Sequence, residues 1–489
     1  MIIVNFIYAI KIIKIKRGQK NMKNKLLGIF VCMLLIITVV LPVSGTVKNS
    51  QIKDMINRDN VLFQPPETWN KTFGGASMDS GYFVQQTFDG GYVVVGTTNG
   101  PLGDVYLVKT DSNGNKEWDS TYGTGVGYCV QQTTDGGYII TGDTGMVGDV
   151  RLIKTDGGGN EQWNKTFGAS KADIGYSVQQ TTDGGYIIAC ASVYVVPPGT
   201  WDAWLIKTDS SGIKQWDNKF GTIYEDYFYS VKQTSDSGYI CVGATNPTNT
   251  NLDVYLVKTD SSGNTAWTMN YGGANDDYGW SVQQTSNGGY IVSGWTDSFG
   301  AGNSDAYLIK TDSAGSVVWT KTFGGANFDY IRHVQVTTDG GFIIIGSTTS
   351  FGAGMSDIYL IKTDSSGTKL WEKTYGGAQN DYGWCAQETS DGGLIIAGET
   401  SSYGTGLSDV WLIKLRGTLT FKFTFLIGKI TNVVTVGSNT EFDAVNLFCI
   451  QFIPFKFVNY NTGETVTISN KIFGIITSNF ILGFFKAAI

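Results

Sequence analysis

The stretch from Val334 to Tyr375 decides the fold: VQVTTDGGFIIIGSTTSFGAGMSDIYLIKTDSSGTKLWEKTY. It contains four short segments of β-forming residues, at 334–337, 342–346, 357–362 and 370–375, separated by segments rich in Asp, Ser and Gly. Glycines such as Gly340 suit tight turns because they adopt positive φ without a steric cost. The second and third segments are too apolar to face water on either side. The stretch therefore predicts one antiparallel sheet of four strands that is covered on both faces.

The same pattern returns seven times between residues 67 and 415, which indicates a repeat protein. One tryptophan marks each repeat, and successive markers are 45 to 53 residues apart. The seven markers are Trp69, Trp118, Trp163, Trp216, Trp267, Trp319 and Trp371. Repeats of about 40 to 50 residues that carry four strands each are typical of β-propeller blades.

The order of the strands at the two ends of the series predicts how the ring closes. The series begins with a fourth strand, at 69–73, and ends with a third strand, at 409–413. Pairing these two strands completes the last blade and leaves no open sheet edge. We therefore expect an all-β chain containing a seven-bladed β-propeller of four-stranded blades, closed by one N-terminal and three C-terminal strands (a 1+3 closure).

The composition supports an all-β chain and excludes some functions. The chain has 64 Gly but only 8 Pro, and 16% of its residues are charged. Its net charge of -7 and its pI near 4.9 argue against nucleic-acid binding, which needs a basic surface. None of the six cysteines lies in a C-x-x-C pair or at metal-ligand spacing, so we expect neither a disulfide framework nor a zinc site. The only histidine, His333, replaces the Ser or Cys of other repeats, and we expect it to be packed rather than catalytic.

The N-terminal segment resembles an export signal. From Met22 the chain has Lys23 and Lys25, then an uncharged apolar run from Leu26 to Val43, then small residues. We interpret residues 1–21 as upstream sequence translated in error or as an extended basic region, 22–45 as a signal peptide and 46–66 as a linker. The alternative is an uncleaved membrane anchor, because an 18-residue apolar run is at the lower limit of spanning length. Either interpretation predicts a secreted or cell-surface protein.

The repeats end after Leu415, and residues 416–489 have a different character. Apolar and polar residues alternate in this region, and a turn at Asn461-Thr462-Gly463 separates candidate strands. The segment from Ile472 to Phe485 is uncharged but only 14 residues long, too short for an ordinary spanning helix. We expect a small C-terminal β domain with this segment in its core strands.

An Asp-x-x-Gly-x-x-x-Trp motif occurs in six repeats, for example at Asp260, Gly263 and Trp267. It resembles the tryptophan-docking motif of quinoprotein (PQQ-type) propellers, and the D-G-G-Y-I-I-x-G core resembles Kelch-like repeats of exported proteins. The resemblance covers the seven repeats and implies architecture, with each marker tryptophan docked as a structural anchor. A quinoprotein dehydrogenase would also have a calcium with carboxylate ligands and usually a vicinal disulfide, yet no two cysteines are adjacent here. The resemblance therefore assigns no cofactor, although PQQ and Ca²⁺ stay open as ligands.

Two sets of aspartates are expected on one face of the ring, the upper face, which carries the loops before each first strand and those between second and third strands. The first-strand set is Asp79, Asp173, Asp226, Asp277, Asp329 and Asp381, and the third-strand set is Asp104, Asp149, Asp202, Asp253, Asp305, Asp357 and Asp409. They could form a cation site near the central opening, where fields focus. We favour the alternative that each carboxylate accepts hydrogen bonds from its own turn, with the doubled Asp276-Asp277 as the best exception.

Repeated residues serve every blade, so binding is expected where the repeats differ. The loops Val193 to Trp201 and Asn246 to Asn251 break the pattern of the other upper loops. The candidate ligand face therefore combines Asp276, Asp277, Asp329, Asp381, Tyr194 and Trp201. We expect a non-catalytic, monomeric propeller that binds a protein or a glycan of the cell envelope. The alternative is a quinoprotein-like dehydrogenase or a polysaccharide-active enzyme.

The opposite, lower face carries a lysine at the end of each third strand. These residues are Lys109, Lys154, Lys207, Lys258, Lys310, Lys362 and Lys414. We expect them to extend along apolar surface or to pair with nearby turn carboxylates. The neighbouring segments such as Asp260 to Asn264 lack the ligand pattern of a calcium loop and are expected to be hairpin turns.

Overall fold

The computed structural model describes residues 67–99, 103–145, 148–168, 171–193 and 200–416, together with the strands of 424–488. The expected signal peptide at 22–45, residues 1–21 and the linker at 46–66 lie outside the described residues. All named elements of the described residues are strands. In this part of the chain, no helix is long and apolar enough to cross a membrane.

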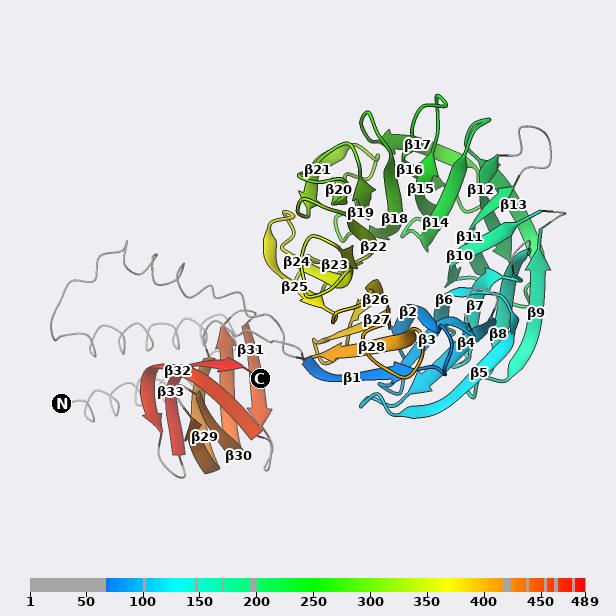
Figure 1. Cartoon of the computed structure of the whole chain (residues 1–489). Coiled ribbons are helices and arrows are strands. Elements are labelled where there is room, and N and C mark those ends of the chain that lie inside the picture. The colour runs from blue at the N-terminus through cyan, green and yellow to red at the C-terminus, as the bar shows by residue number, and fades with distance from the viewer. Residues whose placement is uncertain are drawn as a thin grey trace, which may run out of the picture. The chain divides into compact units, whose positions relative to one another are not determined.

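The first four blades follow one another along the chain, and each has its strands in sequence order from the inner to the outer edge of the ring (Figure 1). Blade 1 contains β2 (Ser80–Gln86), β3 (Tyr92–Thr98), β4 (Asp104–Thr110) and β5 (Lys116–Thr124), and blade 2 contains β6 (Gly127–Gln132), β7 (Tyr138–Asp143), β8 (Val150–Thr155) and β9 (Glu161–Phe167). Blade 3 contains β10 (Asp173–Gln180), β11 (Tyr186–Val193), β12 (Trp201–Thr208) and β13 (Lys214–Phe220). Blade 4 contains β14 (Asp226–Gln233), β15 (Tyr239–Thr245), β16 (Asp253–Thr259) and β17 (Thr265–Tyr271).

The last three blades complete the ring. Blade 5 contains β18 (Asp277–Gln284), β19 (Tyr290–Thr296), β20 (Asp305–Thr311) and β21 (Val317–Phe323). Blade 6 contains β22 (Asp329–Val336), β23 (Phe342–Thr348), β24 (Asp357–Thr363) and β25 (Lys369–Tyr375). Blade 7 contains β26 (Asp381–Glu388), β27 (Leu394–Thr400) and β28 (Asp409–Leu415) together with β1 (Glu67–Phe73). The described residues thus form the expected seven-bladed β-propeller of four-stranded antiparallel blades.

The seventh blade is closed by the N-terminal strand, as the sequence predicts. Strand β1 pairs antiparallel with β28, with Trp69 opposite Lys414 and Thr72 opposite Trp411. The sheet order β1-β28-β27-β26 is the 1+3 closure. The outer edge of β28 is therefore paired by a strand from the other end of the repeats, which ties the ring together.

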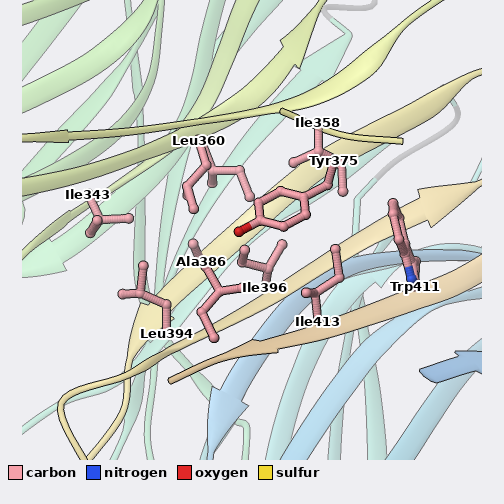
Figure 2. Close-up of a cluster of buried hydrophobic side chains, with 11 residues drawn as sticks. Ile343, Ile358, Leu360, Tyr375, Ala386, Leu394, Ile396, Trp411 and Ile413 are labelled. Carbon is pink, nitrogen blue, oxygen red and sulfur yellow. The ribbon is translucent and has the colours of Figure 1, made fainter. Parts of the chain in front are cut away.

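The core lies between blades rather than within one of them. In the cluster between blades 6 and 7, Leu360 and Tyr375 pack against Ala386 and Ile396 (Figure 2). Leu360, Ala386 and Ile396 are each 0% exposed. The middle strands are apolar on both faces because each sheet is covered by a neighbouring blade on either side.

Six of the seven marker tryptophans lie against a glycine of the next blade around the ring. A Cβ added at Gly263 of blade 4 would lie 2.6 Å from Cζ3 of Trp216 of blade 3, and Gly263 has a φ of 81°. Trp216 also lies 5.9 Å from the ring of Tyr239. The same contact joins Trp69 to Gly114, Trp118 to Gly159, Trp163 to Gly212, Trp267 to Gly315 and Trp319 to Gly367. Trp371 packs against the cluster between blades 6 and 7.

The C-terminal strands form a separate antiparallel sheet. They are β29 (Thr424–Val436), β30 (Asn439–Phe452), β31 (Phe455–Tyr460), β32 (Thr465–Ile476) and β33 (Phe480–Ala488). Their order is β29-β33-β32-β30-β31, and β29 also pairs with β30. The expected small β domain is thus present as a sheet, and the apolar segment 472–485 belongs largely to β32 and β33.

Candidate functional site

The seven inner strands surround the centre of the ring, which we call the central channel (Figure 1). Each inner strand has a register shift against its neighbour, and the shift spans the same position in every blade. A β-bulge redirects the side chain of the extra residue. The residues at this position are Tyr82, Tyr128, Tyr176, Tyr229, Trp280, Arg332 and Trp384. We refer to these seven side chains as the girdle.

The girdle side chains contact one another around the channel. Tyr229 stacks on Trp280 with ring centroids 4.2 Å apart, and Tyr82 meets Trp384 edge-on at 4.7 Å. The Tyr82–Tyr128, Tyr128–Tyr176 and Tyr176–Tyr229 distances are 5.5, 5.2 and 5.0 Å. Arg332 completes the circuit because its guanidinium lies 3.9 Å from the ring centroid of Trp384 and 6.0 Å from that of Trp280. The girdle therefore forms a closed circuit of side chains at one level of the ring.

Arg332 is the only charged member of the girdle. Burial lowers the pKa of its guanidinium to about 10, so the group stays protonated at neutral pH. Its Nε and Nη1 atoms are buried without a hydrogen-bond acceptor in the described structure. The aromatic face of Trp384 partly compensates for the lost hydration of this charge through a cation–π contact.

Above the girdle, aromatic residues gather on one side of the channel mouth. Trp295 lies 4.6 Å from Tyr278, 5.4 Å from Trp280 and 5.0 Å from Tyr330. The group, which we call the upper aromatic cluster, comprises Trp201, Tyr227, Tyr278, Trp295, Phe328 and Tyr330. All are half-buried except Phe328, which is exposed. The cluster extends from blade 3 to blade 6.

No other blade has a tryptophan at the position of Trp295. In the aligned strand registers its counterparts are Thr97, Asp143, Ala191, Ala244, Ser347 and Glu399. The scaffold is thus nearly uniform, whereas this position beside the channel mouth is not. Variation at one place on a rigid frame is where binding specificity is usually built.

The first-strand aspartates are buried inside their own loops. All six are at most 2% exposed. Asp277, Asp329 and Asp381 each accept a hydrogen bond of 2.8 Å from the backbone N–H of the glycine four residues earlier. Serines of the following loop donate to the same carboxylates over 2.6 to 2.8 Å. These hydrogen bonds confirm the turn interpretation, and they leave the three carboxylates away from the molecular surface.

The third-strand aspartates that follow the longer loops have the same role. Asp305 accepts hydrogen bonds from the N–H groups of Ala301 and Gly302, at 2.9 and 3.0 Å. Asp357 and Asp409 repeat this arrangement. Among the residues that the structure describes, no group of three or more His, Cys, Asp or Glu side chains is arranged to hold a metal ion.

The remaining residues of the predicted ligand face lie in different places. Asp276 is half-buried and accepts a 2.8 Å hydrogen bond from the backbone N–H of Leu252, so it joins the loops of two blades. Trp201 lies 5.9 Å from Tyr227 and so belongs to the upper aromatic cluster. Tyr194 lies outside the described residues. Of the six predicted residues, the structure places Trp201 in the upper aromatic cluster and does not gather the four aspartates there.

The lower-face lysines are buried and paired with turn carboxylates in six blades. Lys258 is 6% exposed, and its Nζ lies 2.9 Å from Asp236. The equivalent pairs are Lys109–Asp89, Lys154–Asp135, Lys207–Asp183, Lys362–Asp339 and Lys414–Asp391. In blade 5 the turn has Asn287 instead of Asp, so Lys310 has no such partner, and burial lowers the pKa of Lys310. The expected pairing is thus confirmed in all blades but one.

Side-chain carboxamides join the inner strands in a way that the sequence reasoning missed. Six glutamines each accept a hydrogen bond through Oε1 from a backbone N–H of the next blade: Gln85, Gln131, Gln179, Gln283, Gln335 and Gln387. The equivalent residue of blade 4 is Lys232. The recurring Val-Gln-Gln of the first strands was the available signal. Its meaning depends on the inner strands meeting across the channel, which a linear pattern does not show.

His333, Cys129 and Cys385 are packed beside this ring. Burial, with a further contribution from Lys232, lowers the pKa of His333 to about 3, so its imidazole is neutral. The imidazole bonds to the backbone of Ala386, and its ring meets Phe83 edge-on at 5.8 Å. Cys129, Cys190, Cys241 and Cys385 are buried and unpaired. These residues are part of the packing of the propeller.

A second hollow lies at the closure between blades 6 and 7. This groove of about 680 Å³ runs between β25 and β1, and Glu67, Lys71, Lys373, Tyr375 and Trp411 contribute to its lining. Lys373 Nζ lies 4.6 Å from the ring of Tyr375. The groove is therefore bordered by charges of both signs, unlike the aromatic mouth of the channel.

The strand order and the closure define the class of this chain as a seven-bladed β-propeller. No protein-family model and no curated protein matches it. Among solved structures, it is similar to a protein of unknown function from Dyadobacter fermentans DSM 18053, with 11% identity, a TM-score of 0.42, and coverage of 72% of this chain and 98% of that one. It is also similar to Sqt1 from Chaetomium thermophilum, with 9% identity, a TM-score of 0.44, and coverage of 72% of this chain and 99% of that one. The Pan2 WD40 domain of Neurospora crassa is similar with 11% identity, a TM-score of 0.43, and coverage of 70% of this chain and 97% of that one.

Proposed function

We propose that this chain is a non-catalytic, exported or surface-attached propeller that binds a glycan of the cell envelope at the mouth of its channel. The upper aromatic cluster supports the proposal. Flat aromatic faces with negative π clouds suit the C–H-bearing faces of sugar rings, and half-buried rings present such faces at a small entropic cost. The export signal expected at 22–45 is the reason for placing the ligand in the envelope.

The residues at the channel mouth differ between blades, and this asymmetry favours a site for one specific ligand. Aromatic residues dominate from blade 3 to blade 6, whereas acidic residues occupy the position of Trp295 in two other blades, as Asp143 and Glu399. Asp143 is buried, and Glu399 accepts a 2.7 Å hydrogen bond from Ser80. Aromatic faces combined with a few polar groups are the usual composition of a small-ligand site.

Substitution of Trp295 tests the proposal directly. The full chain is titrated calorimetrically with soluble polysaccharide fragments of the cell envelope, and Trp295→Ala is expected to weaken binding about tenfold or more, as loss of an aromatic anchor does. The matched control is Phe88→Ala, which removes a ring that is 75% exposed on a lower-face turn. Its affinity should equal that of the wild type.

Two results would change the assignment. Equal affinity of the wild type and Trp295→Ala would remove the cluster from the site, and capture of an envelope protein without any glycan binding would replace the glycan by a protein partner. The enzyme alternative is tested by adding PQQ and Ca²⁺ to the purified chain. Stoichiometric cofactor absorbance would favour a quinoprotein-like dehydrogenase over a binding protein.

A further inference from the structure

A small cavity lies on the channel axis, next to the girdle. Its volume is about 100 Å³, and it is lined by Phe83, Val84, Gln85, Cys129, Val130, Gln131, Val178, Lys232, Gln283, His333, Gln335, Cys385 and Gln387. Because a water molecule in the liquid takes about 30 Å³, the cavity has room for roughly three waters or one small ion with a water. Five of the lining residues are glutamines that recur from blade to blade, whereas Lys232 and His333 each occur in one blade.

Lys232 takes the place of a glutamine in blade 4 and so interrupts the ring of glutamines. In the other six blades a glutamine Oε1 accepts the N–H of the next inner strand, and five of these N···O distances are 2.5 to 2.9 Å. An ammonium group has no acceptor, so the N–H of Gln284 lacks the equivalent bond. The seventh step of the ring therefore supplies two donors, Lys232 Nζ and the N–H of Gln284, and no carboxamide acceptor.

The cavity presents unused donors and few unused acceptors. The five lining glutamines use Oε1 for the ring, and their Nε2 groups donate to no described residue. Nearby carbonyls are already engaged: Cys129 Sγ contacts the Val178 oxygen and Cys385 Sγ contacts the Val84 oxygen, both at 3.7 Å. Donors without acceptors favour an anion over water, which needs both.

The charges around the cavity have one sign. Its lining includes no Asp or Glu. His333 is neutral, since burial and Lys232 lower its pKa to about 3, and its Nδ1 is covered. Lys232 is half-buried and makes no ion pair with a described residue, whereas the lower-face lysines of six blades each have a carboxylate. A partly desolvated ammonium group without a counter-ion attracts one.

We propose that the channel cavity binds a small inorganic anion, of the size of chloride or phosphate, between Lys232 Nζ and the backbone N–H of Gln284. The anion takes the place of the missing carboxamide oxygen and completes the seventh step of the ring. The neighbouring glutamine Nε2 groups supply the remaining donors. The site is independent of the glycan site proposed above, because it lies at the level of the glutamine ring.

The variant Lys232→Gln provides the test, because glutamine is the native residue at this position in the other six blades. The thermal midpoint of the full chain is measured at constant ionic strength while gluconate is replaced by bromide, chloride or phosphate. We expect a saturable rise of the midpoint for the wild type, as ligand binding to the folded state requires. Lys232→Gln should show no rise, while Lys321→Gln, on the exposed outer strand β21, should respond as the wild type does.

Bromide soaked into crystals of the wild type gives a readout that does not depend on a variant. Anomalous density beside Lys232 Nζ would support the site, and water alone in the cavity would overturn it. An anion response that persists in Lys232→Gln would also overturn it. The size of the rise with phosphate relative to chloride identifies which anion the site prefers.

Discussion

Asn287 occupies the turn position at which the other six blades have the aspartate that pairs with a buried lysine. Its side chain keeps the turn geometry, since Thr285 Oγ1 donates to Oδ1 over 2.7 Å, as the equivalent threonine does to Asp236. What is missing is the charge next to Lys310, which is only 7% exposed. Blade 5 thus keeps the turn of the other blades but lacks their negative charge at position 287.

Asn287→Asp is therefore expected to stabilise the protein. The new carboxylate would lie beside the Lys310 ammonium with no change in shape, and because it is solvent-exposed like its equivalents, the gain should be about 1 kcal/mol in the free energy of unfolding. Urea unfolding at pH 7 measures it. The reverse change, Asp236→Asn, should lower stability, because it removes the existing partner of Lys258. A neutral or destabilising Asn287→Asp would show that Lys310 gains nothing from a partner.

Strand β1 is the element on which closure depends. It pairs with β28 from Trp69 to Phe73, and Trp69 also packs against Gly114 and Tyr92 of blade 1. It therefore joins the last blade to the first through both backbone hydrogen bonds and a docked indole. In each of the other six blades the fourth strand follows the third strand along the chain, whereas β1 is held in blade 7 by noncovalent contacts alone.

Deletion of residues 67–73 is expected to open the seventh blade. The exposed edge of β28 would have unpaired backbone groups, which favour pairing between molecules. We expect a lower thermal midpoint and a shift to dimers or larger species in size-exclusion chromatography. Deletion of residues 46–66, which keeps β1, is the control and should leave a monomer. A monomer of unchanged stability without β1 would show that blade 7 does not need its fourth strand.

At the scale of the whole molecule, two groups of aspartates give stability an opposite dependence on pH. On the lower face, the Thr and Lys hydrogen bonds outweigh desolvation and lower the pKa of Asp89, Asp135, Asp183 and Asp236 to about 2. Their contribution is present above the unfolded pKa of 3.8 and is lost as the pH falls toward 2. On the upper face, burial raises the pKa of Asp226, Asp253, Asp277 and Asp357. Their contribution is present below 3.8 and is lost as the pH rises through the raised values.

Stability should therefore be greatest at mildly acidic pH and should fall steeply below about pH 4. Urea unfolding measured from pH 2 to pH 8 tests this profile. Asp236→Asn should make the acid limb shallower and leave the limb above pH 5 unchanged. A profile that rises continuously to pH 8 would contradict the assigned role of the upper-face carboxylates.

Much of the architecture was predictable because the sequence signals for strands and turns lie within each repeat. Alternation of apolar strands with Asp-Gly turns is local, so strand order, blade number and the 1+3 closure follow from reading the repeats in phase. The lysine pairs and the loop-bonding aspartates such as Asp381 were also predictable, since their partners lie within one blade. Trp201 was recognised because its loop departs from the repeat.

The tertiary structure decided which residues meet at the channel. Tyr229 and Trp280 are some 50 residues apart in the chain and stack only because bulged inner strands of adjacent blades turn them toward the same axis. The glutamine ring, Arg332 in its aromatic surroundings and the unpaired Lys232 likewise exist only when seven blades close. Repeats determine what each blade contributes, but the closed ring determines which of those contributions become neighbours.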